Sequence, residues 1–158
     1  MNDYKRPTWD EYFFEVMDAV SKRGSCDRGR SGCVIVKDNQ ILTSGYVGAP
    51  SGFPQCDEVG HQIKKTIHED GSISEHCVRT LHAEQNAIIQ AAKRGISLMG
   101  SILYCKMTPC RVCSMFIVGV GITEVKCQKK YKNSTDGEWI LEKGGVKLTY
   151  LSEEVEKY

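Results

Sequence analysis

Apolar side chains near the start of the chain recur with the spacing of a helix. They stand at Trp9, Tyr12, Phe13, Val16, Met17 and Val20. Side chains three or four positions apart share one face of a helix, so this pattern predicts an amphipathic helix over residues 8–21. Thr8 is expected to cap it, with Asp10 and Glu11 in the first turn, where acidic side chains are favourable.

Two runs rich in β-branched and apolar residues follow this helix. They span residues 32–36 and 40–43, and a short polar turn that contains Asp38 and Asn39 separates them. This arrangement predicts an antiparallel hairpin. The second strand leads into a Gly- and Pro-rich loop at residues 45–52, where backbone can approach a ligand closely.

Helical and strand-like patterns alternate from residue 80 onward. Helices are expected over residues 80–95, 109–119 and 136–143, and strands over residues 101–105, 122–127 and 146–151. We expect Thr80 to cap the first of these helices, Gly95 to end it, and Pro109 to begin the second. Right-handed crossovers make the later strands parallel, whereas the first hairpin is antiparallel. The predicted fold class is therefore α/β, a three-layer α/β/α sandwich with a mixed central sheet of about five strands.

Composition places the chain among ordinary globular proteins. Its 158 residues are 41% hydrophobic and 26% charged, which argues against a disordered or fibrous chain, and we expect residues 1–158 to form a single domain. The net charge of +1 lacks the basic excess of a nucleic-acid-binding protein, so nucleic acid is not expected as a partner. No apolar run approaches the length of a membrane span and residues 1–7 are polar, so no membrane contact and a cytoplasmic location are expected.

The chain has eight cysteines, which is many for its length. Without a secretion signal, metal binding is favoured over a disulfide framework. Three of these residues, Cys33, Cys105 and Cys127, lie in strand-like runs and are expected to be small buried hydrophobes. Two others, Cys56 and Cys77, lie in residues 53–79, the least regular stretch, which we expect to be a functional insert or a metal-organised loop.

The strongest chemical signal combines His82 and Glu84 with Cys110 and Cys113. A histidine, a glutamate two positions later and a Pro-Cys-x-x-Cys segment form the signature of zinc-dependent deaminases. His82, Cys110 and Cys113 can occupy three tetrahedral positions of zinc and leave the fourth for water, as catalytic sites do. Glu84 is expected to move protons from that water to the substrate ring and the departing amine. A zinc ribbon would need a second cysteine pair at matching distance, which the sequence lacks.

Beyond this signature, the chain resembles the deoxycytidylate (dCMP) deaminases of the cytidine deaminase-like superfamily. The resemblance rests on residues 44–52, 76–87 and 108–113. It implies a cytidine deaminase-like fold over residues 1–158 and the hydrolysis of dCMP to dUMP and ammonia, which feeds dTMP synthesis. In that reaction hydroxide attacks C4 of the pyrimidine and Glu84 protonates N3.

The resemblance also implies residues that contact the substrate. The backbone of Ala83 and Thr108 is expected at the pyrimidine edge, and Tyr131 is expected to line the pocket. The loop that contains Tyr46, Val47 and Gly48 is expected to frame the sugar and phosphate. Relatives commonly carry Gly-Tyr-Asn-Gly in this loop, and Val47 cannot make the side-chain hydrogen bond that asparagine would make.

A second, structural zinc occurs in some members of the family that the chain resembles. Cys26, Cys56, His76 and Cys77 suit such a site, with His61 in reserve; the alternative is a set of buried free thiols and a surface histidine. The family further implies a homo-oligomer, often a hexamer, that dCTP activates and dTTP inhibits, with Mg²⁺ accompanying these nucleotides.

Two other functions remain open at this stage. The zinc signature identifies the reaction and not the substrate, so a deaminase of another cytosine or purine nucleotide, nucleoside or base has the same metal ligands. A version that edits nucleic acid would need a basic channel with exposed aromatic residues. The chain could also be a catalytically silent zinc-binding regulatory module, although an intact Glu84 argues against this.

Overall fold

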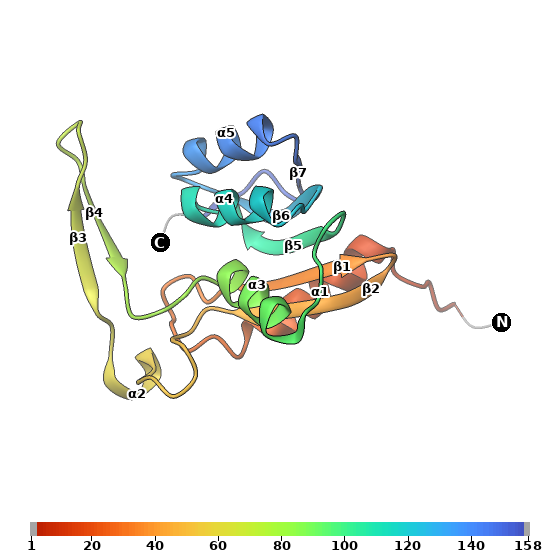
Figure 1. The fold of residues 1–158 in the computed structure, drawn as a ribbon, viewed down its shortest axis with the longest axis horizontal. Coiled ribbons are helices and arrows are strands. Elements are labelled where there is room, and N and C mark those ends of the chain that lie inside the picture. Colours follow the sequence, from red (N-terminus) through yellow and green to blue (C-terminus); the bar gives the residue numbers. More distant parts are fainter. Residues whose placement is uncertain (1–2, 157–158) are drawn as a thin grey trace.

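The computed structural model describes residues 3–156 and shows a central sheet between helices (Figure 1). In chain order its elements are α1 (Trp9–Ser21), β1 (Gly32–Lys37), β2 (Gln40–Tyr46), α2 (Cys56–Val59), β3 (Ile63–Ile67), β4 (Ile73–Cys77), α3 (Ala83–Arg94), β5 (Ile102–Met107), α4 (Arg111–Gly119), β6 (Glu124–Tyr131), α5 (Thr135–Lys143), β7 (Lys147–Tyr150) and β8 (Val155–Glu156). None of the described helices has the length and apolar composition needed to cross a membrane.

The strands of the main sheet lie in the order β2-β1-β5-β6-β7, and β8 pairs with β6 beyond this path. β1 is antiparallel to β2 and to β5, whereas β6 is parallel to β5 and to β7. The mixed sheet of the predicted α/β fold is thus confirmed. Within this main sheet only β8 was not expected, because two residues are too few to show a periodic pattern.

Helices cover both faces of this sheet, which makes the three predicted layers (Figure 1). On one face Phe13 and Met17 of α1 pack with Val34 of β1 in a buried cluster. On the other face α3, α4 and α5 contribute to the main core, where Ala87 and Ile117 are fully buried. Alternating side chains of each strand point to opposite faces, so every central strand supplies both cores.

The predicted helix boundaries need two corrections, at α3 and at α4. The N-cap of α3 is His82 and not Thr80. Leu81 exchanges backbone hydrogen bonds with Gly48, which holds the chain extended until His82. In the same way α4 begins after Cys110, its N-cap, and not at Pro109. By contrast, the predicted Thr8 cap of α1 is confirmed and includes a reciprocal capping box.

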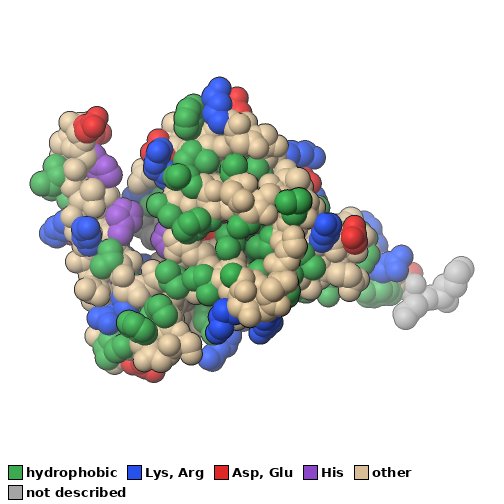
Figure 2. All heavy atoms as spheres, in the orientation of Figure 1, with side chains coloured by type: hydrophobic (Ala, Val, Ile, Leu, Met, Phe, Trp, Pro, Cys, Tyr) green, Lys and Arg blue, Asp and Glu red, His purple; other side chains and the backbone are tan. Residues whose placement is uncertain are grey.

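Residues 63–77 are regular, contrary to the expected irregular loop. β3 and β4 form a two-stranded antiparallel hairpin that projects from the body (Figure 1). Every residue of β3 is exposed, and a strand with no buried face has no reason to alternate apolar and polar residues. Histidine side chains lie along the hollow between this hairpin and the body (Figure 2).

Candidate active site

The three predicted zinc ligands come together in space. His82 Nδ1 lies 3.5 Å from Cys110 Sγ and 3.5 Å from Cys113 Sγ. In a tetrahedral site with Zn–S and Zn–N distances of about 2.3 and 2.0 Å, neighbouring ligand atoms are roughly 3.5 to 3.8 Å apart. The arrangement of these side chains therefore fits a zinc ion with one further position for water.

Two helix N-termini present these ligands. His82 and Cys110 are the N-cap residues of α3 and α4, and Cys113 lies in the first turn of α4. The N–H group of Cys113 also donates to Cys110 Sγ at 3.5 Å. Backbone N–H groups and the positive ends of helix dipoles favour anionic ligands, so this junction favours the thiolate that zinc needs.

The three ligand side chains differ in their affinity for protons. A hydrogen bond from Cys113, with the nearby His82, lowers the pKa of the Cys110 thiol to about 4. Its hydrogen bond to Cys110 raises the pKa of His82 to about 9. The Cys110 thiolate and burial raise the pKa of Cys113. These shifts favour an imidazolium, a thiolate and a thiol near neutral pH, and a metal ion must displace the protons of the imidazolium and of the thiol in order to bind.

Glu84 stands beside the ligands in the first turn of α3. Its Oε2 atom lies 3.7 Å from Cys113 Sγ, and the side chain is buried. Burial raises the pKa of Glu84, although the positive charge of His82 opposes the shift. A carboxyl group that takes up a proton more readily than usual is suited to general acid and base catalysis.

The pocket that holds these groups is bordered by Val47, Thr108 and Tyr131, as expected for substrate contacts, and also by Arg28 and His76. Thr108 Oγ1 accepts a hydrogen bond from the backbone N–H of Tyr131 at 3.2 Å. That bond joins the segment between β5 and α4 to the end of β6. Sequence reasoning did not identify Arg28 as a pocket residue, because nothing in its local pattern distinguishes it from the neighbouring Arg30.

Three other residues expected to contact the substrate do not border this pocket. Tyr46 lines a separate cleft together with Phe53, so its ring does not frame the sugar and phosphate from this conformation. Gly48 is hydrogen-bonded through its backbone to Leu81. The side chain of Ala83 is fully buried, and the contact expected of Ala83 concerns its backbone. Of the loop residues expected around the sugar, only Val47 borders the pocket.

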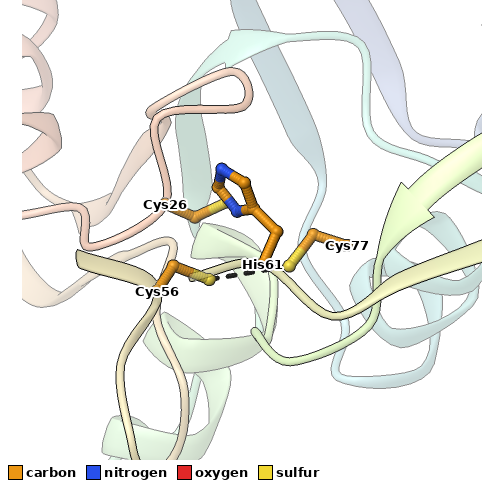
Figure 3. Close-up of side chains that lie close together, drawn as sticks. All are labelled: Cys26, Cys56, His61 and Cys77. Carbon is orange, nitrogen blue, oxygen red and sulfur yellow. Dashed lines mark hydrogen bonds between the residues drawn. The ribbon is translucent and has the colours of Figure 1, made fainter. Parts of the chain in front are cut away.

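A second group of potential ligands consists of Cys26, Cys56, His61 and Cys77, whose side chains point toward one another (Figure 3). Cys56 Sγ lies 3.5 Å from Cys77 Sγ, and Cys26 Sγ lies 3.6 Å from His61 Nδ1. The other ring nitrogen of His61 contacts Asp27 Oδ1 at 2.9 Å, as metal-binding histidines commonly contact a carboxylate. Four protein ligands are typical of a closed structural zinc site.

His76 is not part of this group, which corrects the ligand expected from the sequence. Successive residues of β4 point to opposite sides, so Cys77 faces the group and His76 faces away from it. The Nε2 atom of His76 lies 3.0 Å from Ser74 Oγ. His61, the reserve candidate, occupies the fourth position. Recognition of β4 as a strand would have separated Cys77 from His76.

The two groups of ligands share a wall of the pocket. Cys26 and Cys77 border the pocket, and Val47 is buried with Cys26 and Cys56 in a small apolar cluster. The backbone N–H of Val47 donates to the carbonyl of Ser31 at 3.0 Å. Metal binding at the second group would therefore stabilise one side of the catalytic pocket.

Comparison with known proteins places this geometry in a family. Residues 7–129 match the family described as the cytidine and deoxycytidylate deaminase zinc-binding region. The deoxycytidylate deaminase of Schizosaccharomyces pombe is 36% identical over 143 residues, which cover 90% of this chain and 44% of that protein. That of Mycobacterium phage D29 is 34% identical over 127 residues, which cover 79% of this chain and 98% of the phage protein.

A solved structure agrees with these sequence relatives. The crystal structure of dCMP deaminase from cyanophage S-TIM5 in complex with dCMP and dUMP has a TM-score of 0.74 and 32% identity, and the match covers 93% of this chain and 99% of that one. This chain spans less than half the length of the two yeast relatives, 44% and 46%. Because the family match includes His82, Glu84, Cys110 and Cys113, this chain belongs to the cytidine and deoxycytidylate deaminase zinc-binding family.

Proposed function

We propose that this chain catalyses the zinc-dependent hydrolysis of dCMP to dUMP and ammonia as a single deaminase domain over residues 1–158. The observation that carries this proposal is the position of Glu84 beside the group of His82, Cys110 and Cys113, at a pocket that Glu84, His82 and Cys110 border. Three relatives that carry the name deoxycytidylate deaminase support the choice of substrate. The product dUMP would feed the synthesis of dTMP.

The chemistry divides between the metal and Glu84. Zinc held by His82, Cys110 and Cys113 would supply Lewis acidity, which makes water a nucleophile near neutral pH. Glu84 accepts one proton of the attacking water and delivers it to N3 of the pyrimidine. Glu84 then takes the second proton from the hydroxyl group on C4 and passes it to the departing amine, so that ammonia leaves and the C4 carbonyl forms. Its raised pKa favours the protonated carboxyl that the second half of the reaction needs.

The pocket walls position the nucleotide. The backbone of Ala83 and Thr108 is proposed to contact the pyrimidine edge, and Tyr131 to lie against the substrate. Val47 contributes an apolar surface where many relatives have an asparagine, so recognition of the sugar here depends on other groups. Tyr46 and Gly48 influence substrate binding through the conformation of the loop and not by contact with the substrate.

A substrate panel tests this function. Zinc-loaded protein should release ammonia from dCMP faster than from dCTP, cytidine, cytosine or guanine. Glu84→Gln should abolish turnover and retain zinc, because removal of a general acid and base costs about 10² to 10⁴ in rate. Faster release of ammonia from cytosine or guanine than from dCMP would contradict the choice of dCMP as the substrate. Full turnover by Glu84→Gln would contradict the catalytic role of Glu84.

We propose further that Cys26, Cys56, His61 and Cys77 hold a second, structural zinc. The four ligand atoms lie within 4.8 Å of one another. Burial acts to raise the pKa of Cys77, but hydrogen bonds from the backbone of Arg79 and Gln62 lower it to about 6, which favours a thiolate ligand. Metal analysis should find two zinc ions per chain and one in Cys56→Ser; one ion in both proteins would contradict the site.

We also propose that the chain forms a homo-oligomer, and the resemblance to the family implies a hexamer. It is supported by the outward face of α4, where Val112, Met115 and Phe116 are 49%, 55% and 49% exposed. Apolar side chains lie across the middle of the face shown in Figure 2. Burial of such a surface against a second copy of the chain is favourable.

Regulation and location complete the proposal. We infer activation by dCTP and inhibition by dTTP, each with Mg²⁺, from the resemblance to the family. Rates with dCMP should rise when dCTP and Mg²⁺ are added and fall when dTTP and Mg²⁺ are added; unchanged rates would contradict regulation. None of the eight cysteines forms a disulfide, which supports a reducing compartment such as the cytoplasm.

A further inference from the structure

We propose that Glu138 and Tyr150 are positioning residues that act through Thr108 on one wall of the catalytic pocket. This inference rests on the proposed function, because that wall is the one expected to contact the pyrimidine. Thr108 and Tyr131 border the pocket, whereas Glu138 and Tyr150 border a separate hollow at the surface. An effect of Glu138 or Tyr150 on the reaction must therefore pass through other residues.

A chain of hydrogen bonds links these side chains. Tyr150 Oη donates to Glu138 Oε1 at 2.8 Å and lies 3.1 Å from Thr108 Oγ1. Ser134 Oγ donates to the same oxygen of Glu138 at 2.9 Å. At the other end, Thr108 Oγ1 accepts from the backbone N–H of Tyr131 at 3.2 Å. The chain thus runs from α5 through the end of β7 to the pocket wall.

The carboxylate of Glu138 sets the direction of this chain. A tyrosine hydroxyl has one proton to donate. Because Tyr150 gives that proton to Glu138, the hydroxyl of Thr108 must donate to Tyr150. Burial and the hydrogen bond to Glu138 raise the pKa of Tyr150, so Tyr150 keeps its proton near neutral pH. The Thr108 hydroxyl then has no proton left for a substrate, which agrees with a contact through its backbone.

Burial makes this chain unfavourable to break. Thr108 is 2% exposed, and Glu138 and Tyr150 are both partly buried. A buried polar group without a partner is unfavourable, so the hydroxyl of Thr108 keeps one orientation while Tyr150 accepts its proton. The same oxygen atom in turn holds the backbone N–H of Tyr131.

Packing holds the same segment from α5. Gly137, the neighbour of Glu138, lies so close to Pro109 that a Cβ atom would collide with the carbonyl oxygen of Pro109. Pro109 joins Thr108 to the proposed ligand Cys110 in the sequence. α5 lies beside α4, which begins directly after Cys110 (Figure 1). The first turn of α5 thus contacts this segment by packing as well as through the hydrogen-bonded chain.

The end points of the chain decide which kinetic constant it affects. Its hydrogen bonds end at Thr108 and Tyr131 and do not include Glu84 or the zinc ligands. Displacement of this wall should weaken binding of the pyrimidine more than it slows proton transfer by Glu84. We therefore expect loss of the chain to raise KM and to change kcat less.

Single substitutions test the chain in the zinc-loaded protein. Steady-state rates with dCMP are measured without dCTP or dTTP. Tyr150→Phe and Glu138→Leu should each raise KM about threefold to tenfold and lower kcat by less than about twofold, because one net hydrogen bond corresponds to roughly that factor in binding. Glu138→Gln keeps an oxygen that accepts from Tyr150 and should retain most of the wild-type KM. Tyr150→Phe removes a single oxygen atom and keeps the test informative if Glu138→Leu does not fold.

A double-mutant cycle distinguishes a chain from independent packing effects. Thr108→Val removes the central hydroxyl and should raise KM at least as much as Tyr150→Phe. The combined variant should have the KM of Thr108→Val alone, because residues of one hydrogen-bonded chain do not act additively. The control is Glu142→Leu, one turn after Glu138 and at the same hollow, which should match the wild type. Additive effects, an unchanged KM in Tyr150→Phe, or an equal rise in Glu142→Leu would overturn the proposal.

Hydrogen exchange of the Tyr131 amide distinguishes this inference from the proposed function, because it needs no substrate. Thr108→Val and Tyr150→Phe should each speed this exchange by about threefold or more, and amides in the middle of β6 should exchange as in the wild type. Unchanged exchange at Tyr131 in both variants would overturn the inference whatever the activity. Faster exchange there, with a wild type that deaminates no cytosine compound, would contradict the proposed function and support the positioning of the wall.

Discussion

Individual residues of the catalytic site have protonation states that oppose metal binding at low pH. His82, with a pKa raised to about 9, is an imidazolium near pH 7, and Cys110, with a pKa lowered to about 4, is a thiolate. The pKa of Cys113 is raised, so it is a thiol. Zinc requires a neutral imidazole and two thiolates, and therefore displaces protons from His82 and Cys113.

Zinc binding near pH 7 should release about two protons per catalytic site. Above pH 9, where His82 is already neutral, it should release about one proton, so the apparent affinity for zinc should rise less steeply with pH. Titration calorimetry of metal-free protein in two buffers with different ionisation enthalpies measures this number. The titration uses the Cys56→Ser variant, so that only the catalytic site binds zinc. Binding heats that do not depend on the buffer would contradict the proposed release of protons from His82 and Cys113.

Between elements, the contact of β2 with α3 positions His82 and Glu84. Gly45 of β2 lies against the backbone of Ala83 and Ala87, where a Cβ atom would collide. Thr43 of the same strand donates through Oγ1 to the carbonyl of Ala87 at 3.0 Å. A glycine is thus required for close approach here, although the sequence pattern indicated only a strand that enters a loop.

Gly45→Ala should lower the free energy of unfolding by about 1 to 3 kcal/mol, because the methyl group has no space against the helix backbone. It should also lower kcat by displacement of the first turn of α3. Gly119→Ala is the matched control, since a Cβ at Gly119 has no neighbour within 4 Å, and it should be neutral or slightly stabilising. Denaturant unfolding compares them, and equal stability of the two variants would contradict the close contact.

The β3–β4 hairpin depends on the second group of ligands at its base. Every residue of β3 is exposed, so packing contributes little to the stability of this element. Chelation of the second metal, or Cys56→Ser, should increase hydrogen exchange of the β3 and β4 amides at least tenfold more than exchange of β1 and β5. Equal exchange of the hairpin with and without the metal would show that it is stable by itself.

At the scale of the whole molecule, the exposed apolar face of α4 has no partner within the described chain. We expect a second copy to cover it. Phe116→Glu should reduce the mass measured by light scattering, because burial of a new charge at an interface is unfavourable. Leu151→Glu changes a residue that is also exposed but lies outside α4, and it should leave the mass unchanged. A monomeric wild type would contradict the interface.

The sequence by itself determined the features that depend on local order. The helical stripe of α1, the turn at Asp38 and Asn39 and the short-range Cys110 and Cys113 pair follow from residue spacing, since neighbours along the chain must be neighbours in space. The mixed sheet was predicted from the alternation of helices and strands after the first hairpin. The pairing of His82 and Glu84 with these cysteines was recognisable because the signature specifies which residues the fold brings together.

Only the tertiary structure decided which distant residues share a site. The bridge between Leu81 and Gly48 holds the chain extended up to His82, the N-cap of α3. Cys77 belongs to the second ligand group and His76 does not, because successive residues of a strand point to opposite sides. Arg28 borders the pocket through a bond to Glu75, 47 positions away in the sequence. Contacts over such separations depend on the packing of the whole chain, which local patterns do not record, so the choice of His61 over His76 in the second ligand group became visible only in the folded molecule.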